Sequence, residues 1–266
     1  MPSHLCRGRE RLTTLVPQAS SAARPNHSSI TSAEKAWLLR RLRAKSALRS
    51  PSTPEVTPPP CLSSGVISFG SLNNFVKVNE TVRALWAELL ANVPDARLVL
   101  HIKETRARQT LLDLFAERGV ASNRLSLIGY QAEADYLATY SQIDIALDTT
   151  PFAGGTTSFD ALWMGVPLVT LAGERSSSRG GASILTSLGR SEWIARSPEQ
   201  YIAIAQSLAS DPQQLAAIRR GLRTELQASP LMDGAGFTRE LEDAYHQAWE
   251  QHRASLKDNT VHRAAN

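Results

Sequence analysis

The chain is poor in the residues that build covalent or metal-bound frameworks. Its 266 residues include two cysteines, and aromatic residues make up only 6%. Cys6 and Cys61 have no metal-type spacing, so we expect free thiols in a reducing, cytoplasmic compartment. No apolar run approaches the roughly 20 residues that a membrane-spanning helix needs, so we expect no membrane partner.

Histidine is scarce as well, with six residues in the whole chain. None has a nucleophile and an orienting acid at a recognisable spacing, which argues against a hydrolytic triad. His101 ends an expected strand, where it either faces a ligand crevice or has the commoner, structural role. The expected ligand loops contain no DxD-type acidic pair. We therefore expect a site that works without a metal ion or another cofactor.

Acidic residues are rare at the start of the chain. Residues 1–65 contain ten Lys or Arg and three Asp or Glu, a balance of +7, whereas the remaining residues contain 19 and 22, a balance of −3. The positive net charge thus belongs to the N-terminal segment, and the rest is mildly acidic. This distribution argues against nucleic acid as a partner.

Composition divides the chain into a basic tail over 1–65, one domain over 66–252 and a disordered tail over 253–266. The start of the first tail is rich in Arg, Ser and Pro, which fits disorder better than an organelle transit peptide. A capping box of Thr31 and Glu34 then predicts a short basic helix. A proline-rich linker leads from this helix to the domain.

Apolar runs and helical patterns alternate through the domain. We expect strands near 66–69, 97–101, 124–128, 143–147 and 166–170. We expect helices near 79–92, 105–118, 132–141, 156–164, 178–188, 198–209, 212–227 and 236–252. This alternation predicts an α/β fold with a doubly wound, Rossmann-like parallel sheet. In the last helix Tyr245 and Trp249 stand at i and i+4, and we expect them to pack back on the domain.

The most informative stretch reads IDIALDTTPFAGGTTSFDALWMGVPLVTL. A short apolar run, typical of a buried parallel strand, stops at Asp148. Gly154 and Gly155 then turn the chain and let the backbone approach a ligand. Thr156 and Thr157 follow where a helix must start, and N–H groups there have no partner inside the helix. An anion can bind at such a helix start, with the threonine hydroxyls as further donors.

Asp160 lies one helical turn beyond Thr156, on the same helix face. Its carboxylate could accept hydrogen bonds from a sugar hydroxyl while phosphates lie on the turn above it. A bare glycine pair between a strand and a helix can also be only a tight connection. The whole constellation favours a nucleotide or phosphate site.

This region resembles the catalytic region of the O-GlcNAc transferase and SPINDLY-like family of protein O-glycosyltransferases. The likeness includes LDTTPFAGGTTSFDALWMGVPLVTLAGE, then SSSRGGASILTSLG, with FGSLNNFVKVNETVRALWAELL upstream and ELEDAYHQAW near the end. It covers residues 66 to about 252 and matches the C-terminal, donor-binding half of the two-lobed GT-B fold. The resemblance implies an enzyme that transfers GlcNAc from UDP-GlcNAc to Ser or Thr of an acceptor protein.

The resemblance gives Lys77 the central role. It implies that Lys77 contacts the diphosphate of a UDP-sugar and acts in catalysis, with Asn74 beside it. The residues themselves support this, because a lysine just after a strand's carboxyl end faces the crevice of an open parallel sheet. There its charge can stabilise the leaving group without a metal. The competing interpretation is a solvated surface lysine.

The same resemblance assigns the rest of the donor site. Thr156 and Thr157 would bind the phosphates through the helix start, and Asp160 would hold the ribose. The chain departs from the family pattern at two positions. Tyr136 stands where many members have a donor-side histidine, and Gly155 stands where animal enzymes have a histidine and bacterial relatives have the GGTT form.

Family members also carry an N-terminal lobe with histidines implicated in acceptor activation, usually after tetratricopeptide repeats. Residues 1–65 show no 34-residue period and are too few for a sheet domain. We therefore expect either that a separate chain supplies the N-terminal lobe, or that this chain is a non-catalytic lobe that grips a UDP-sugar. A GT-B enzyme that uses another UDP-sugar is the third alternative.

Overall fold

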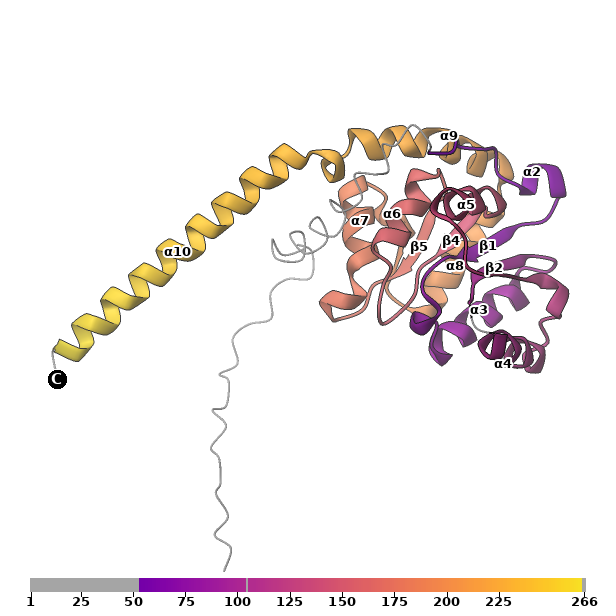
Figure 1. Cartoon of the computed structure of the whole chain (residues 1–266), viewed down its shortest axis with the longest axis horizontal. Helices are drawn as coiled ribbons and strands as arrows, with labels where there is room; N and C mark the ends of the chain where they lie inside the picture. Colours follow the sequence, from indigo (N-terminus) through magenta and orange to yellow (C-terminus); the bar gives the residue numbers. More distant parts are fainter. Residues whose placement is uncertain (1–52, 104, 265–266) are drawn as a thin grey trace, which may run out of the picture.

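A computed structural model describes residues 53–103 and 105–264, and Figure 1 shows the chain. The basic helix expected from Thr31 and the thiol of Cys6 lie outside the described residues. So does the segment 1–30, for which disorder was expected. In the described ranges no helix is long and apolar enough to cross a membrane.

Six parallel strands form one sheet in the order β3-β2-β1-β4-β5-β6. They are β1 (Ser68–Ser71), β2 (Arg97–His101), β3 (Leu125–Ile128), β4 (Ile145–Leu147), β5 (Leu168–Leu171) and β6 (Ile194–Ala195). The first three strands extend the sheet in one direction, and the chain then returns past β1 to add the other three. This order is that of a doubly wound, Rossmann-like sheet. The predicted fold class is confirmed.

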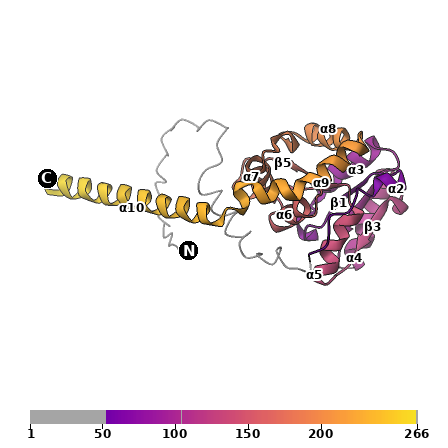
Figure 2. The ribbon, with the colours of Figure 1, turned by 90° about the horizontal axis from the view of Figure 1, so that it is seen from above.

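Helices cover both faces of the sheet (Figures 1 and 2). They are α2 (Cys61–Ser64), α3 (Glu80–Asn92), α4 (Thr105–Glu117), α5 (Glu133–Ala138), α6 (Thr156–Trp163), α7 (Gly180–Leu188), α8 (Pro198–Ala209), α9 (Pro212–Ala228) and α10 (Gly234–Ala264). The chain packs α3 against α8 on one face, and α6 against α7 and α9 on the other. Between these layers β4 is fully buried, as its apolar sequence requires.

Side-chain caps fix where three of the long helices begin. Asn79, Ser197 and Asp211 each stand just before a helix and accept a hydrogen bond from a backbone N–H of its first turn. These caps satisfy N–H groups that have no partner inside the helix. Proline follows the cap in α8 and α9, where its missing N–H costs nothing.

The domain begins earlier than residue 66, so the expected boundary is wrong. The proline-rich segment is no free linker, because Arg219 of α9 donates to the Thr57 carbonyl at 2.6 Å and Arg223 donates to the Pro54 carbonyl at 2.9 Å. Cys61 is buried in the core, and its backbone N–H donates to Asp144 at 3.1 Å. The thiol of Cys61 is free, as predicted, and burial followed by the neighbouring Asp144 raises its pKa to about 12.

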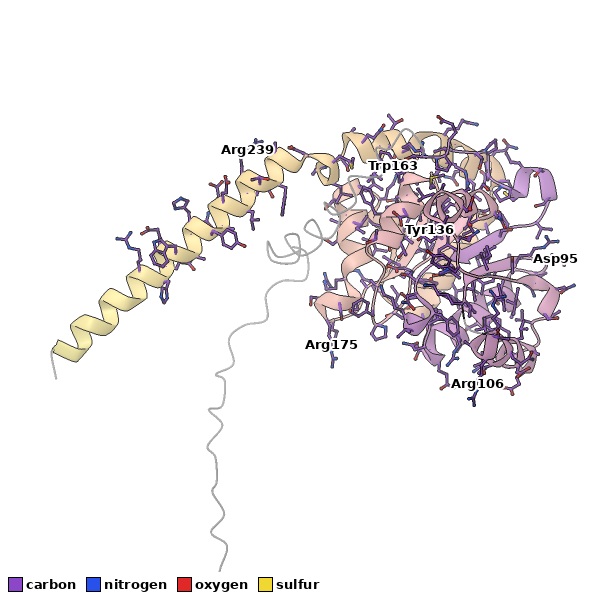
Figure 3. All side chains as sticks on the ribbon, in the orientation of Figure 1. Asp95, Arg106, Tyr136, Trp163, Arg175 and Arg239 are labelled. Carbon is purple, nitrogen blue, oxygen red and sulfur yellow. The ribbon has the colours of Figure 1, made fainter. Side chains whose placement is uncertain are left out.

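The last helix corrects two expectations. It was expected over 236–252 with a disordered tail beyond, but α10 continues to Ala264, since no glycine or proline follows Gly236 to end it. Tyr245 and Trp249 do not pack back on the domain and are 66% and 58% exposed. The turn η7 (Pro230–Met232) lies beside the start of α10, and the helix then extends away from the sheet (Figures 1, 2 and 3).

Candidate functional site

The candidate site lies at the carboxyl edge of the sheet, where β1 and β4 are neighbours. The chain after β1 passes through Asn73 and Asn74 into the 3-10 helix η2 (Phe75–Lys77). The chain after β4 forms a loop over 148–155 that leads into α6. The strand order reverses at this pair, and ligands of open parallel sheets bind at such a switch point.

Lys77 lies against the loop that precedes α6. Its Nζ donates to the Ala153 carbonyl at 2.9 Å and stands 4.6 Å from the centre of the Phe152 ring. A second tie is close by, where the side-chain amide of Asn79 donates to the Thr150 carbonyl at 2.8 Å. The chain after β1 is therefore fastened to the loop after β4 at two points, and a cation is held next to the start of α6.

The start of α6 has no side-chain cap. Gly155 precedes the helix, and Thr156 begins it. A Cβ added at Gly155 would meet nothing within 4 Å, so the backbone at the helix start borders open space. Gly154 differs, because a Cβ there would collide with Ser158 and lie 2.9 Å from Asp148 Oδ1. Gly154 is thus required by packing, whereas Gly155 leaves room beside the helix end, where the dipole favours an anion.

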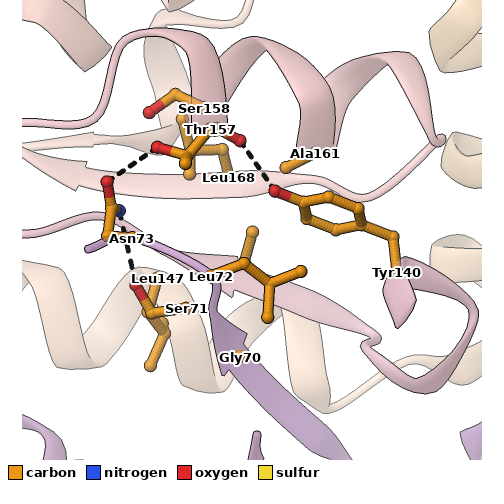
Figure 4. Close-up of a pocket in the computed structure, with 11 residues that line it drawn as sticks. Gly70, Ser71, Leu72, Asn73, Tyr140, Leu147, Thr157, Ser158, Ala161 and Leu168 are labelled. Carbon is orange, nitrogen blue, oxygen red and sulfur yellow. Dashed lines mark hydrogen bonds between the residues drawn. The ribbon is translucent and has the colours of Figure 1, made fainter. Parts of the chain in front are cut away.

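Thr157 faces β1 rather than the open side of the helix start. Its hydroxyl donates to Asn73 Oδ1 at 2.7 Å (Figure 4). The expected neighbour of Lys77, Asn74, is exposed and accepts a hydrogen bond from the Val76 N–H at 3.1 Å, capping η2. Of the two asparagines after β1, Asn73 is therefore the one that reaches α6. Neither periodicity nor spacing distinguished the two.

Asp160 is fully buried and lies under two tyrosines. The Tyr136 hydroxyl donates to Asp160 Oδ2 at 3.4 Å and lies 3.3 Å from the Tyr140 hydroxyl, which donates to the Thr157 carbonyl at 3.0 Å. Burial, followed by the charge of Asp160, raises the pKa of Tyr136 above its ordinary value of 10.0. The structure thus brings Tyr136 to Asp160, but the carboxylate contacts a phenol and is closed to solvent.

His101 belongs to the same edge of the sheet. It is the last residue of β2, and its ring meets that of Tyr136 edge to face, with centroids 6.4 Å apart. This contact gives His101 a packing role beside the tyrosines.

Asp148 is a member of the site that sequence reasoning left without a role. Its carboxylate is buried at the end of β4 and accepts hydrogen bonds from Thr149, Gly154 and Thr170. The available signal was its position, since it is the first polar residue after a buried strand that leads to a glycine turn. Tyr140 was missed as well, because its contact with the α6 backbone spans 17 residues.

A small cavity lies beneath the first turn of α6, between that helix and strands β1 and β4. Its volume is about 10 Å³, the room for one water molecule. Asn73, Tyr140 and Thr157 line it, together with residues of β1, β4, β5 and α6 (Figure 4). The cavity is too small for a nucleotide, so a ligand of that size would lie outside it, along the loop and Lys77.

Comparison with known proteins identifies relatives of this chain. The family description "Glycosyl transferase family 41" matches residues 43–241. A protein of Hordeum vulgare named probable UDP-N-acetylglucosamine–peptide N-acetylglucosaminyltransferase SPINDLY is 40% identical over 207 residues, which are 76% of this chain and 22% of the relative. The UDP-N-acetylglucosamine–peptide N-acetylglucosaminyltransferase of Caenorhabditis elegans is 28% identical over 195 residues, 73% of this chain and 17% of that protein.

Solved structures agree with these relatives. A mutant O-GlcNAc transferase of Thermobaculum terrenum is 39% identical with a TM-score of 0.68, and the match covers 76% of this chain and 39% of that one. S. aureus TarM, solved with UDP among its ligands, is only 8% identical with a TM-score of 0.51 and shares the fold alone. The expected GT-B lobe is confirmed.

The chain spans about a fifth of the length of the curated relatives it matches, 22% in the barley protein. The match to the family description nevertheless includes β1 to β6 and both sides of the candidate site. The chain therefore belongs to glycosyl transferase family 41.

Proposed function

We propose that this chain binds the UDP-sugar donor of a protein O-glycosyltransferase, which transfers GlcNAc from UDP-GlcNAc to Ser or Thr of an acceptor protein. One observation carries the proposal. The Lys77 ammonium is bonded at 2.9 Å to the loop whose next residues open α6. A fixed cation and the positive end of a helix dipole at one point suit a diphosphate. The names of the relatives support the sugar and the peptide acceptor.

The chemistry follows from charge. During transfer the bond between the sugar carbon and the diphosphate oxygen breaks with its electron pair on UDP, and the acceptor hydroxyl loses its proton as it bonds to the sugar. Lys77 and the N–H groups at Thr156 and Thr157 would stabilise the negative charge that develops on the leaving diphosphate. Lys77 is thus the catalytic residue of this proposal, and no metal ion takes part.

Other contacts of the donor belong to the same proposal. Asn74, Gly154 and Gly155 would border the diphosphate, with Gly155 giving the room. Asp160 would hold the ribose, for which the Tyr136 hydroxyl must give up its hydrogen bond to the carboxylate. Tyr136 would then contact the donor from the side of the β2 end.

An acceptor protein and an N-terminal lobe are the proposed partners. The chain covers only part of its longer curated relatives, 22% for the barley protein. An N-terminal lobe would complete the acceptor side of the fold, and a cytoplasmic location is proposed. If no such lobe restores transfer, a donor-binding function without catalysis is the conclusion instead.

Calorimetric titration with UDP tests the donor site. The 266-residue protein should bind UDP with magnesium present or with EDTA added. Uridine should bind more weakly, because it lacks the diphosphate that Lys77 attracts. If the folded protein shows no heat or thermal shift with millimolar UDP, or binds it only when magnesium or manganese is present, the proposed site is wrong.

Radiolabelled UDP-GlcNAc and acceptor peptides test catalysis. Holding donor and acceptor in attack geometry can lower the activation barrier of such a reaction by up to about 7–11 kcal/mol. We therefore expect no measurable transfer by the 266-residue polypeptide alone, and transfer once the N-terminal lobe of a family member is added. Labelling of peptides by the polypeptide alone would show that it contains an acceptor site.

A further inference from the structure

Asp148 stands at the point where the loop of the candidate site begins. It follows β4 directly, and the residue is 2% exposed. Its Oδ1 accepts hydrogen bonds from the Thr149 N–H at 2.9 Å and from the Gly154 N–H at 2.6 Å. Its Oδ2 accepts one from the Thr170 hydroxyl at 2.9 Å. A single buried side chain therefore binds both ends of the loop and the neighbouring strand β5.

The bond to Gly154 closes the loop. Because this hydrogen bond joins residues six positions apart, it restricts the conformation of the chain between them. Ala153 lies in this part of the chain, and its carbonyl holds the Lys77 ammonium. Gly155 follows directly and precedes α6. The same carboxylate oxygen thus determines where the cation lies and where the helix start opens.

The loop is also fixed against α7. A Cβ added at Gly181, in the first turn of that helix, would collide with the Asp148 carboxylate and the Thr170 hydroxyl. The Ala153 N–H donates to the Ser177 carbonyl at 2.9 Å, just before α7. Contacts this close leave the carboxylate little room to move, so the loop between β4 and α6 is held from two sides.

The backbone of Asp148 is anchored as well. Its carbonyl accepts a hydrogen bond from the buried Tyr201 hydroxyl at 3.1 Å, and that hydroxyl accepts one from Trp86 Nε1 at 3.3 Å. These residues come from α8 and α3 on the far face of the sheet. Asp148 therefore connects the loop on one side of the sheet to helices on the other.

Buried charge gives a further reason to expect a specific role. Burial raises the pKa of Asp148 above its ordinary value of 3.8, and the hydrogen bonds from Gly154, Thr170 and Thr149 oppose this, as does the charge of Lys77. An apolar residue would avoid the cost of burying a carboxyl group. What an apolar residue cannot do is accept the two loop N–H groups.

We propose that Asp148 is a positioning residue for the donor diphosphate. Its carboxylate holds the loop over 148–155 so that Lys77 and the start of α6 converge on one point. This inference rests on the proposed function and adds the residue that assembles its site. Asp148 itself touches no substrate and acts through the Gly154 N–H and the Ala153 carbonyl.

Titration of variants with UDP and with uridine tests the role. Asp148→Ala should lower the affinity for UDP about tenfold or more, because two buried N–H groups lose their acceptor and the loop relaxes. The affinity for uridine should change little. Asp148→Asn should stay within about threefold of the native affinity, because its Oδ1 can accept the same two N–H groups and its amide can donate to Thr170. Rescue by asparagine distinguishes loop positioning from a need for the negative charge.

Asp144→Ala is the matched control. Asp144 is equally buried at the other end of the same strand and also accepts two backbone N–H groups. This variant should lose stability but keep the native ratio of UDP to uridine affinity. In addition, the losses of UDP affinity caused by Asp148→Ala and Lys77→Ala should not multiply in the double variant, because both substitutions act at the same contact.

The outcomes separate the two proposals. Failure of the native protein to bind UDP overturns the proposed function. Two results would overturn the positioning role in a native protein that binds UDP. One is a folded Asp148→Ala variant with the native ratio of UDP to uridine affinity. The other is a double variant in which the losses of UDP affinity from Asp148→Ala and Lys77→Ala multiply fully. Should Asp148→Ala not fold, Asp148→Asn decides, since it keeps the Oδ1 acceptor of the loop N–H groups and removes only the negative charge. A folded Asp148→Asn protein that loses UDP affinity about tenfold while its uridine affinity is kept would then overturn the positioning role.

Discussion

Strand β4 carries a buried aspartate at each end, and the two do different work. Asp144, before the strand, accepts N–H groups of Cys61 at 3.1 Å and Ser68 at 2.8 Å. Asp148, after it, accepts N–H groups of Thr149 and Gly154. The chemistry is the same, but Asp144 ties the start of the domain to the sheet, whereas Asp148 shapes a loop at the ligand-binding edge. In a parallel sheet the end of the strand thus decides whether a buried carboxylate serves stability or a site.

Substitution of Arg219 should have the largest effect on stability, and this residue lies at the amino end of β4. It is 2% exposed, and it donates to the carbonyls of Thr57 at 2.6 Å, Ile143 at 2.6 Å and Tyr140 at 2.8 Å. Arg219→Leu should lower the free energy of unfolding by about 3 kcal/mol, because buried acceptors lose their donor. Urea unfolding measures this loss, and the UDP affinity of the folded fraction should not change.

The next residue supplies the control. Arg220 is exposed on the same helix, so Arg220→Leu should change the free energy of unfolding by less than about 0.5 kcal/mol. Equal losses for the two variants would contradict the assignment of Arg219 to the amino-end network. A weaker UDP affinity in folded Arg219→Leu would break the division between the two ends of β4.

Lys77 tests the carboxyl end directly. Lys77→Ala should weaken the binding of UDP by about 1.5–3 kcal/mol, the usual contribution of a hydrogen bond to a charged group. The binding of uridine should weaken little. Lys103 is the matched control, because it also follows a strand at this edge of the sheet but lies exposed, 5.3 Å from the centre of the Tyr130 ring. Lys103→Ala should leave both affinities unchanged. Equal losses of UDP and uridine in Lys77→Ala would mean that Lys77 does not contact the diphosphate.

Asp144→Asn should have a smaller effect than Arg219→Leu, with a free energy of unfolding within about 1 kcal/mol of the native value at neutral pH. Asparagine loses one acceptor but also removes a buried charge. Burial raises the pKa of Asp144 above its ordinary value of 3.8, against the opposing bonds from Cys61 and Ser68. The stability that this group contributes is therefore complete below pH 3.8 and is lost as pH rises through the raised pKa.

The stability of the native protein relative to Asp144→Asn should accordingly fall as pH rises above 3.8. Unfolding of both proteins in urea at a series of pH values measures the difference. A difference that grows with pH would show that the folded chain lowers the pKa of Asp144, and the two N–H groups would then outweigh burial.

Much of the fold could be predicted because its signals are local. Apolar runs marked five strands, and the glycine turn before Thr156 marked the start of α6 at the observed residue. Strand β6 was missed because Ile194 and Ala195 are too few to form an apolar run. The segment before Cys61 was interpreted as a linker, since sequence gives no sign that Arg219 would bond to its carbonyls.

The site could be predicted less completely, because its contacts join distant residues. Lys77 was placed at the correct edge by its position after a strand, but its partner Ala153 lies 76 residues further on. Asn73 and Asn74 are equivalent by composition, and only the turn of η2 decides which one reaches Thr157. On α10, i and i+4 spacing puts Tyr245 and Trp249 on one face without telling whether anything covers it.

A crystal structure of this protein with UDP bound would show directly whether Lys77 and the start of α6 hold the diphosphate. We expect diphosphate oxygens within about 3 Å of Lys77 Nζ and of a backbone N–H at Thr156 or Thr157. The Asp148 carboxylate should keep its bond to the Gly154 N–H. A diphosphate bound away from the start of α6, with Lys77 still bonded to the Ala153 carbonyl, would show that the donor site lies elsewhere.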